Sequence, residues 1–243
     1  MLVKRNNFSG YDMKKFYEKH EFLFCMLLIL IYIVINSICL NFFGITDYRT
    51  SIINILLSIL VIIFIIKNKL GNYYGLTTFP SPNKYLYFIP LIMIISVNLW
   101  NRINIVNTPS EIIFYIICMI SVGFLEEIIF RGFLFKMMEK DNVKTAIIVS
   151  SVTFGIGHII NLFNGADILP TLMQIMYATA AGYLFVTIFY KSKSLWPCII
   201  THILVNSLSI FNGTENIISI WVAPVFLTVV SILYAMYINK TVN

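Results

Sequence analysis

Three charged residues lie inside an apolar stretch of the chain, residues 111–135: Glu126, Glu127 and Arg131. A charge at the centre of a bilayer costs about 2.5–3.5 kcal/mol on insertion scales, so such residues usually face a protein interior or an aqueous cavity and mark function. Glu127 and Arg131 are four residues apart and share a helix face, which predicts an ion pair. Glu126 is rotated by about 100° from Glu127 on a helix of about 3.6 residues per turn. We expect Glu126 to face a cavity, where a carboxylate can act as a general base on water.

The histidines supply further groups for such chemistry. The chain has three; His20 lies in a basic N-terminal segment and is expected to be solvated, whereas His158 and His202 lie in apolar stretches. Asn206 follows His202 by four residues and shares its helix face. A neutral imidazole can orient a water or bind a metal, and an amide can donate to a developing oxyanion. The set predicts a water-activating hydrolase within the membrane; the alternative is that each residue makes a polar contact between helices.

The composition predicts the helices that must position these residues. Hydrophobic residues make up 59% of the 243 residues, charged residues only 12%, and the mean hydropathy is +0.86, whereas soluble domains carry about twice that charged fraction. A membrane span needs about 20 mostly apolar residues. We expect an all-α, polytopic membrane bundle that forms a single domain over residues 1–243. Eight spans are predicted, at residues 21–43, 51–66, 85–100, 111–135, 143–160, 169–190, 195–211 and 216–238.

The distribution of basic residues predicts the orientation. Of the 17 Lys and Arg residues, 14 lie in the N-terminal segment, in the second, fourth and sixth loops and at the C-terminus, whereas Arg49 and Arg102 fall in loops on the other side. The positive-inside rule then places both termini in the cytoplasm. Basic residues divided among short loops face anionic lipid, so the net charge of +6 does not indicate a nucleic-acid partner.

Helix geometry predicts the depth of the site. At about 1.5 Å per residue, Glu126 lies about 15 Å along its helix from Lys136, and His202 about 13 Å from Lys193. His158 lies about 21 Å from Lys144 at the basic end of its own span, so the fifth helix is expected either to be strongly tilted or to begin further out in the cytosol. The site is expected to open toward the cytoplasm. Two remaining features are interpreted as structural: four single cysteines as packing residues, and residues 67–85 as a connecting loop.

Three motifs carry a family resemblance. Residues 126–131 (EEIIFR) match EExxxR, residues 154–158 (FGIGH) match FxxxH, and residues 202–206 (HILVN) match HxxxN. In this order they resemble the signature motifs of the CPBP family, the CAAX proteases and bacteriocin-processing enzymes, also called the Abi family. The match covers about residues 111–215, which would form the catalytic core.

The resemblance implies an intramembrane endopeptidase, similar to the type II CAAX prenyl endopeptidase. Glu126 and His158 would activate water, His202 and Asn206 would position the scissile carbonyl and stabilise its oxyanion, and Glu127 and Arg131 would support them. The family is often classed with metalloproteases, and Glu126, His158 and His202 are three candidate zinc ligands. The chain has no HExxH, however, so we favour a metal-independent mechanism and expect no cofactor.

The expected partners are membrane lipid and a peptide or protein substrate, including membrane-anchored ones. Richness in Ile, Asn and Lys is typical of bacterial proteins, so the expected setting is a bacterial plasma membrane, and the expected role is peptide or bacteriocin maturation or immunity. Two alternatives remain open: a proton-coupled transporter, which also uses buried Glu, Arg and His, and a catalytically inactive immunity protein. No inverted repeat of the transporter kind is visible.

Overall fold

The computed structural model describes residues 11–80, 87–100, 103–213 and 216–241. Helices make up 81% of the structure and no β-strand is formed over these ranges, so the predicted all-α class is confirmed.

Six helical segments are long and apolar enough to cross a membrane. They are α2 (Glu21–Phe43), α3 (Tyr48–Lys67), the continuous helix Pro109–Met138, the segment Val143–Phe163, α9 (Ile168–Ser192) and the segment Ile218–Thr241. Two further apolar segments are shorter, Ile89–Leu99 and Trp196–Phe211. They begin with α4 (Ile89–Ser96) and α10 (Trp196–Leu208). Helix length and composition therefore support six membrane spans over the described residues. The predicted total of eight spans stays a prediction.

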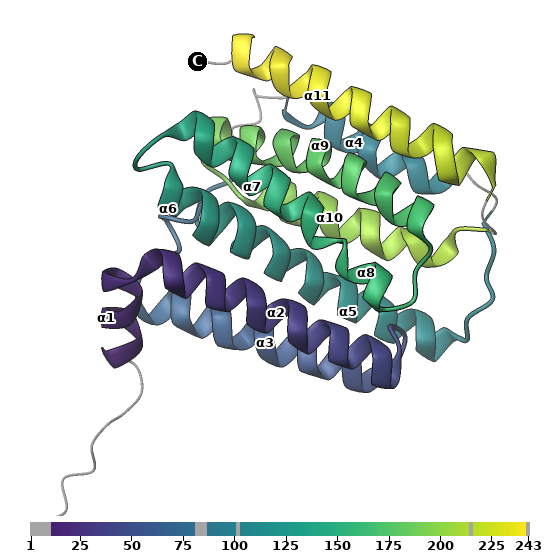
Figure 1. The fold of residues 1–243 in the computed structure, drawn as a ribbon, viewed down its shortest axis with the longest axis horizontal. Helices are drawn as coiled ribbons and strands as arrows, with labels where there is room; N and C mark the ends of the chain where they lie inside the picture. Colours follow the sequence, from purple (N-terminus) through teal and green to yellow (C-terminus); the bar gives the residue numbers. More distant parts are fainter. Residues whose placement is uncertain (1–10, 81–86, 101–102, 214–215, 242–243) are drawn as a thin grey trace, which may run out of the picture.

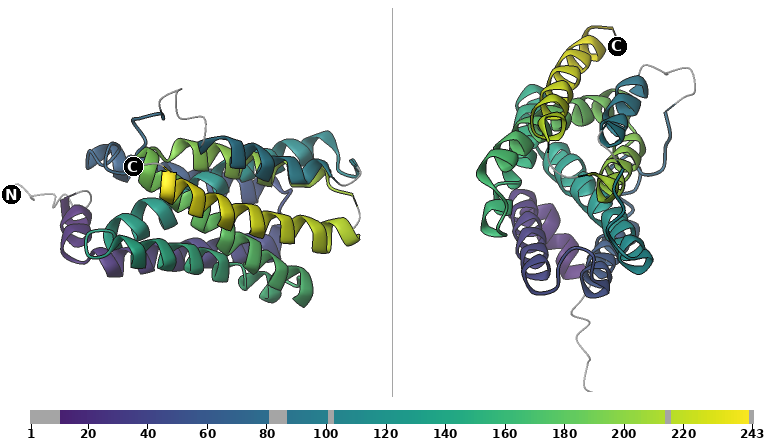
Figure 2. Two further views of the ribbon diagram at one scale, coloured as in Figure 1. Left: turned by 90° about the horizontal axis from the view of Figure 1, so that it is seen from above. Right: turned by 90° about the vertical axis from the view of Figure 1, so that its right-hand side faces the viewer.

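The long helices run roughly along one axis, with α5 (Pro109–Glu127) in the middle of the bundle (Figure 1, Figure 2). It packs against α3 on one side and α10 on the other, while α9 packs between α7 (Val143–Gly157) and α11 (Ala223–Thr241). A short helix, α1 (Tyr11–Lys19), lies beside the start of α2. Because α5, α7 and α10 each carry one of the three motifs, their packing decides the site geometry.

Two glycines allow the motif helices to approach closely. A Cβ added at Gly123 on α5 would lie 3.0 Å from the backbone nitrogen of Ile203 on α10. A Cβ at Gly155 on α7 would lie 1.9 Å from Thr179 Oγ1 on α9. Small residues at helix contacts are a general means of close packing in membranes, and here they hold α5 on α10 and α7 on α9.

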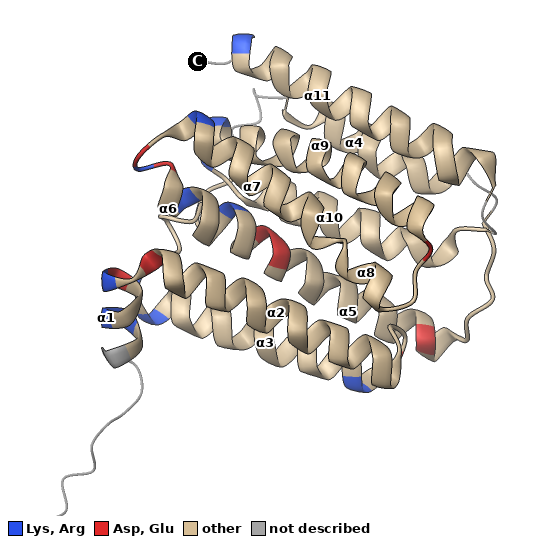
Figure 3. Ribbon diagram, in the orientation of Figure 1, with Lys and Arg blue, Asp and Glu red and all other residues tan. Residues whose placement is uncertain are grey.

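Charged residues gather at one end of the bundle, where α1, the turn between α6 (Lys136–Met138) and α7 and the C-terminal end of α11 lie (Figure 3). We call this the basic end. The opposite end carries the α2–α3 turn and α8 (Ile160–Phe163) (Figure 1). The positive-inside rule predicts that the basic end lies in the cytoplasm. Which face of the membrane each end occupies stays a prediction.

The loop after α3 is packed onto the bundle and is more than a connector. The Leu195 backbone N–H donates to the Gly75 carbonyl at 3.0 Å, and Trp196 Nε1 donates to the Leu76 carbonyl at 2.8 Å. The hydroxyls of Tyr17 and Tyr74 are 2.9 Å apart, and Tyr74 is fully buried. The loop thus ties α1 to the α9–α10 turn at the basic end.

Candidate active site

A fully buried ion pair supports the centre of the site. Arg131 Nη1 lies 3.0 Å from Glu127 Oε1, and neither side chain is exposed to solvent. The guanidinium carbon also lies 4.1 Å above the ring of Phe154, at the distance of a cation–π contact. The pairing expected from the four-residue spacing is present.

The helix changes its winding between these two partners. Residues Ile128–Phe135 form a π-helix that continues α5, and all eight are buried. Single π-helical turns inside α-helices are frequent at functional sites because the extra residue re-aims side chains. Ser150 Oγ on α7 donates to the Phe130 carbonyl of this segment at 2.8 Å. The motif spacing gave no signal of this irregularity, since EExxxR also suits a regular α-helix.

His202 joins the two carboxylates. Its Nδ1 lies 2.8 Å from Glu127 Oε1, and its Nε2 lies 3.4 Å from Glu126 Oε2. An ionised carboxylate only accepts hydrogen bonds, so the Nδ1 proton is assigned to the bond with Glu127. We expected His202 to act on the substrate beside Asn206; the structure places it on the glutamates as well.

Glu126 has a hydrogen-bond donor that the sequence reasoning missed. Tyr32 on α2 donates its hydroxyl to Glu126 Oε1 at 2.6 Å. The second oxygen of Glu126, Oε2, is buried and has no hydrogen-bond partner among the described residues. The only sequence signal was a tyrosine in mid-span, followed at helical spacing by Asn36, and neither has a charge to draw attention.

His158 reaches the same region despite the depth that helix counting gave it. It is the C-terminal cap of α7, and its ring makes an edge contact with the Phe154 ring at 5.3 Å. The Phe154 ring also makes an edge contact with the His202 ring at 5.7 Å. Phe154 therefore contacts both histidines. The depth estimated from residue counts assumed that each helix lies parallel to the membrane normal. Helix tilts are instead set by packing against neighbouring helices.

Two cavities meet at Glu126 and His158. The first, the histidine cavity, has a volume of about 130 Å³; its polar lining is Glu126, His158, Gln174, Tyr177, His202 and Asn206. The second, the asparagine cavity, is also about 130 Å³; its polar lining is Tyr32, Asn36, Ser37, Glu126, His158, Asn161 and Asn164. Each has room for several waters, since one water needs about 10–15 Å³ of such space. All four predicted catalytic residues therefore line one cavity, with Glu127 and Arg131 directly behind it.

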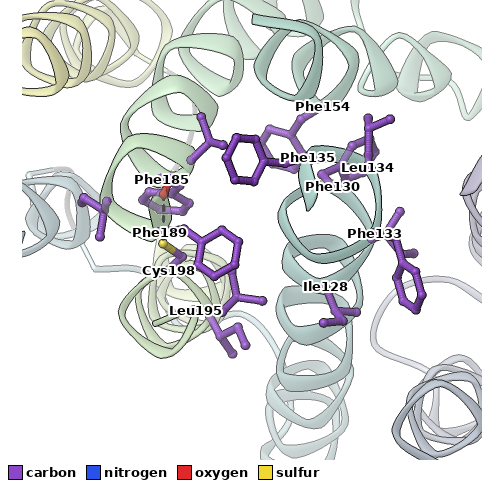
Figure 4. Close-up of a cluster of buried hydrophobic side chains, with 14 of the residues drawn as sticks. Ile128, Phe130, Phe133, Leu134, Phe135, Phe154, Phe185, Phe189, Leu195 and Cys198 are labelled. Atoms are coloured by element: carbon purple, nitrogen blue, oxygen red, sulfur yellow. Dashed lines mark hydrogen bonds between the residues drawn. The ribbon is translucent and has the colours of Figure 1, made fainter. Parts of the chain in front are cut away.

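Both cavities extend from Glu126 toward the end opposite the basic end. The asparagine cavity reaches Ile45 in the α2–α3 turn and Asn164 after α8, and the histidine cavity reaches Asn206 near the end of α10. On the basic side of Glu126, residues 128–135 of the same helix are all buried, and Figure 4 shows buried apolar side chains of this segment and its neighbours. They include Ile128, Phe130, Phe133, Leu134, Phe135, Phe189, Leu195 and Cys198. We expected the site to open toward the basic end, whereas the cavities extend the other way. The depth of a residue along its helix does not reveal on which side of it other side chains fill the interior.

The arrangement of donors does not fit a zinc ion. Among the described residues, no three or more His, Cys, Asp or Glu side chains are grouped so that they could hold a metal. Glu126 and His202 approach each other, but His202 Nδ1 already bonds Glu127. A catalytic zinc needs three protein ligands that leave one position open.

Comparison with known proteins finds two similar sequences. Residues 108–208 match the model of the family described as "Type II CAAX prenyl endopeptidase Rce1-like". The protein named "Putative membrane peptidase YdiL" from Bacillus subtilis (strain 168) is 34% identical over 94 residues, which are 38% of this chain and 34% of that protein. The chain thus matches about a third of the length of this curated relative. No solved structure matches the chain.

The matched segment runs from the cap of α5 to the end of α10 and contains all three motifs. Both matches support a CPBP, CAAX-protease-type family for this segment of the chain. This assignment covers the reacting groups but not Tyr32, which precedes the matched segment.

Proposed function

We propose that the protein is an intramembrane endopeptidase in which Glu126 is the general base that activates water. The observation that carries this proposal is the position of Glu126 Oε2. It is buried, has no hydrogen-bond partner among the described residues, and lies where two cavities meet beside His158. Tyr32 donates a hydrogen bond to the other oxygen, Oε1, and His202 Nε2 lies 3.4 Å from Oε2. A carboxylate so held can accept a proton from a water in the cavity.

The bond changes follow from this geometry. Glu126 takes a proton from water while the water oxygen bonds to the scissile carbonyl carbon, and the carbonyl oxygen becomes an oxyanion. Asn206, on the wall of the same cavity, donates a hydrogen bond to that oxyanion. Glu126 then passes its proton to the leaving amide nitrogen, and the carbon–nitrogen bond breaks.

The supporting residues keep this geometry fixed. Glu127 accepts from His202 Nδ1 and thereby sets the orientation of the ring toward Glu126. Arg131 neutralises Glu127 within the buried cluster. His158 lines both cavities with Glu126 and would hydrogen-bond the attacking water there.

Cleavage by a Glu126→Gln variant tests the proposal. The purified variant is assayed against a pool of membrane-anchored and soluble peptides in liposomes, with the products read by mass spectrometry. Loss of a general base lowers turnover by about 10²–10⁴-fold. Glu111→Gln is the matched control on the same helix, because glutamine also suits the capping box that Glu111 forms with Thr108. Wild-type rates in Glu126→Gln would refute the mechanism.

The remaining parts of the proposal concern setting and cofactor. We place the protein in a bacterial plasma membrane with eight crossings and both termini in the cytoplasm, and we assign it to peptide maturation or immunity. The reaction is metal-independent, so activity should survive strong chelators, and purified active protein should hold less than stoichiometric zinc. Loss of activity on chelation and its return with zinc alone would overturn this part.

A further inference from the structure

The lining of the asparagine cavity is more polar than that expected of a groove that faces lipid. Three amides face it from two separate elements, Asn36 on α2 and Asn161 and Asn164 on and after α8. Among the lining residues Glu126 is the only one with a charge. The cavity therefore combines several uncharged hydrogen-bonding groups with one reacting carboxylate.

These amides keep unused hydrogen-bonding capacity. Asn36 Nδ2 donates to the Tyr32 carbonyl at 3.0 Å, and Asn161 Nδ2 donates to Gln174 Oε1 at 2.8 Å. Each primary amide has two N–H donors and an oxygen that accepts twice. Among the described residues, the side-chain bonds found use one donor on each. The cavity can offer the remaining groups to a bound molecule.

The rim of the cavity is closed by a small polar network. Ser37 Oγ and Asn41 Nδ2 on α2 both donate to Asn164 Oδ1, at 2.6 and 2.8 Å. This network joins the second half of α2 to the segment after α8, at the end of the bundle opposite the basic end (Figure 1). Such bonds at a partly exposed site are individually weak, so they can exchange for bonds to a ligand.

We propose that an extended, uncharged peptide segment binds in the asparagine cavity and enters between α2 and α8, from the membrane face opposite the basic end. This rests on the proposed protease function and names its substrate. An extended segment has unpaired backbone N–H and C=O groups, which need partners in a membrane, and the three amides supply such partners. A charged side chain would lose its water without gaining an opposite charge, apart from the reacting Glu126.

The position of the cavity decides the side of entry. From the asparagine rim the path leads past Tyr32 to Glu126 and His158, and beyond them the π-helical segment Ile128–Phe135 is fully buried. The basic end is therefore packed, and under the positive-inside rule it lies in the cytoplasm. The peptide then arrives from the extracytoplasmic face.

Cysteine labelling tests the side of entry without any cleavage. The four native cysteines are buried and are replaced by serine. Asn164→Cys reports the rim, and Asn68→Cys, also half-buried, reports the basic end at the C-cap of α3. In intact cells a membrane-impermeant maleimide should label Asn164→Cys, whereas Asn68→Cys should react only after permeabilisation. The reverse pattern would overturn extracytoplasmic entry.

Protection by a peptide tests the binding site. Leu40→Cys, at an apolar lining residue of the asparagine cavity, is placed in a Glu126→Gln background, so that an added ten-residue uncharged peptide is not consumed. The peptide should slow labelling at position 40 at least fivefold and leave Asn68→Cys unchanged. The same peptide with a central lysine should not protect. Equal labelling rates with and without the uncharged peptide would overturn the site.

Kinetics in the active protein give the second readout. Asn36→Ala should raise KM about fivefold, equivalent to about 1 kcal/mol, and change kcat by less than twofold. Asn68→Ala is the control and should change neither. Cleavage without protection at position 40 would refute this site and leave the protease function standing. Protection without cleavage by wild type would support this site and refute the protease function.

Discussion

Removing Arg131 while Glu127 stays in place should be among the most destabilising single changes in this protein. Arg131→Met keeps much of the side-chain volume but leaves a carboxylate that is fully buried. Breaking a buried pair by removing one partner typically costs about 3–5 kcal/mol. The contact of the guanidinium with Phe154, 4.1 Å from the ring centre, is lost as well. The remaining bond from His202 Nδ1 to Glu127 places the expected loss near the lower limit, at about 3 kcal/mol.

The double variant separates charge pairing from mere packing. Glu127→Gln keeps an oxygen acceptor for His202 but leaves Arg131 as an unpaired cation. Combining it with Arg131→Met removes both charges, so the double variant should be more stable than Arg131→Met alone. We expect a coupling of about 2 kcal/mol, within the range for residues in direct contact.

Unfolding in mixed micelles with rising SDS measures these differences, followed by the fluorescence of the three tryptophans. Wild type, both single variants and the double variant complete the cycle. Additive losses, with the double variant the least stable of the four, would refute the view that the cluster is held by compensation of buried charges.

Three further outcomes follow from the contacts of the site. Tyr32→Phe keeps the ring but removes the donor to Glu126; kcat should fall about tenfold with an unchanged melting temperature, and an unchanged kcat would show that the hydroxyl is dispensable. Asn206→Ala should lower kcat about 10²–10³-fold with little change in KM, as for other oxyanion donors; a change confined to KM would argue for a ground-state contact instead. Gly155→Ala should cost about 1–3 kcal/mol by overpacking, since its Cβ would meet α9 at 1.9 Å, whereas Gly157→Ala has nothing within 4 Å and should be tolerated. Thermal unfolding in detergent compares the two glycine variants, and equal stability would contradict the close helix contact.

Several features of this protein could be read from the order of residue types along the chain. A charged cluster in an apolar run predicted the buried pair of Glu127 and Arg131, because a four-residue spacing suffices to align two side chains on a helix. Apolar stretches of sufficient length likewise predicted the six long helices. Local spacing and composition carry both kinds of information.

Other features depend on contacts between distant segments. Tyr32 meets Glu126 across 94 residues of sequence, and no local pattern marks that pairing. The double contact of His202 depends on how closely α10 approaches α5 at Gly123, and the π-helical winding after Glu127 depends on packing of its buried side chains. The direction of the cavities depends on which side chains fill the bundle, a property of the packed interior.

The hydrogen bond from Tyr32 has a consequence for how proteins that share the matched segment can diverge. The reacting groups lie in residues 108–208, whereas α2, which supplies the donor to Glu126, lies outside the matched segment. The same helix carries Asn36 and part of the asparagine rim. Exchange of the first two helices between relatives would therefore alter the environment of the glutamate and the peptide path while leaving every motif residue in place. Such chimeras would separate the inherited chemistry from the choice of substrate.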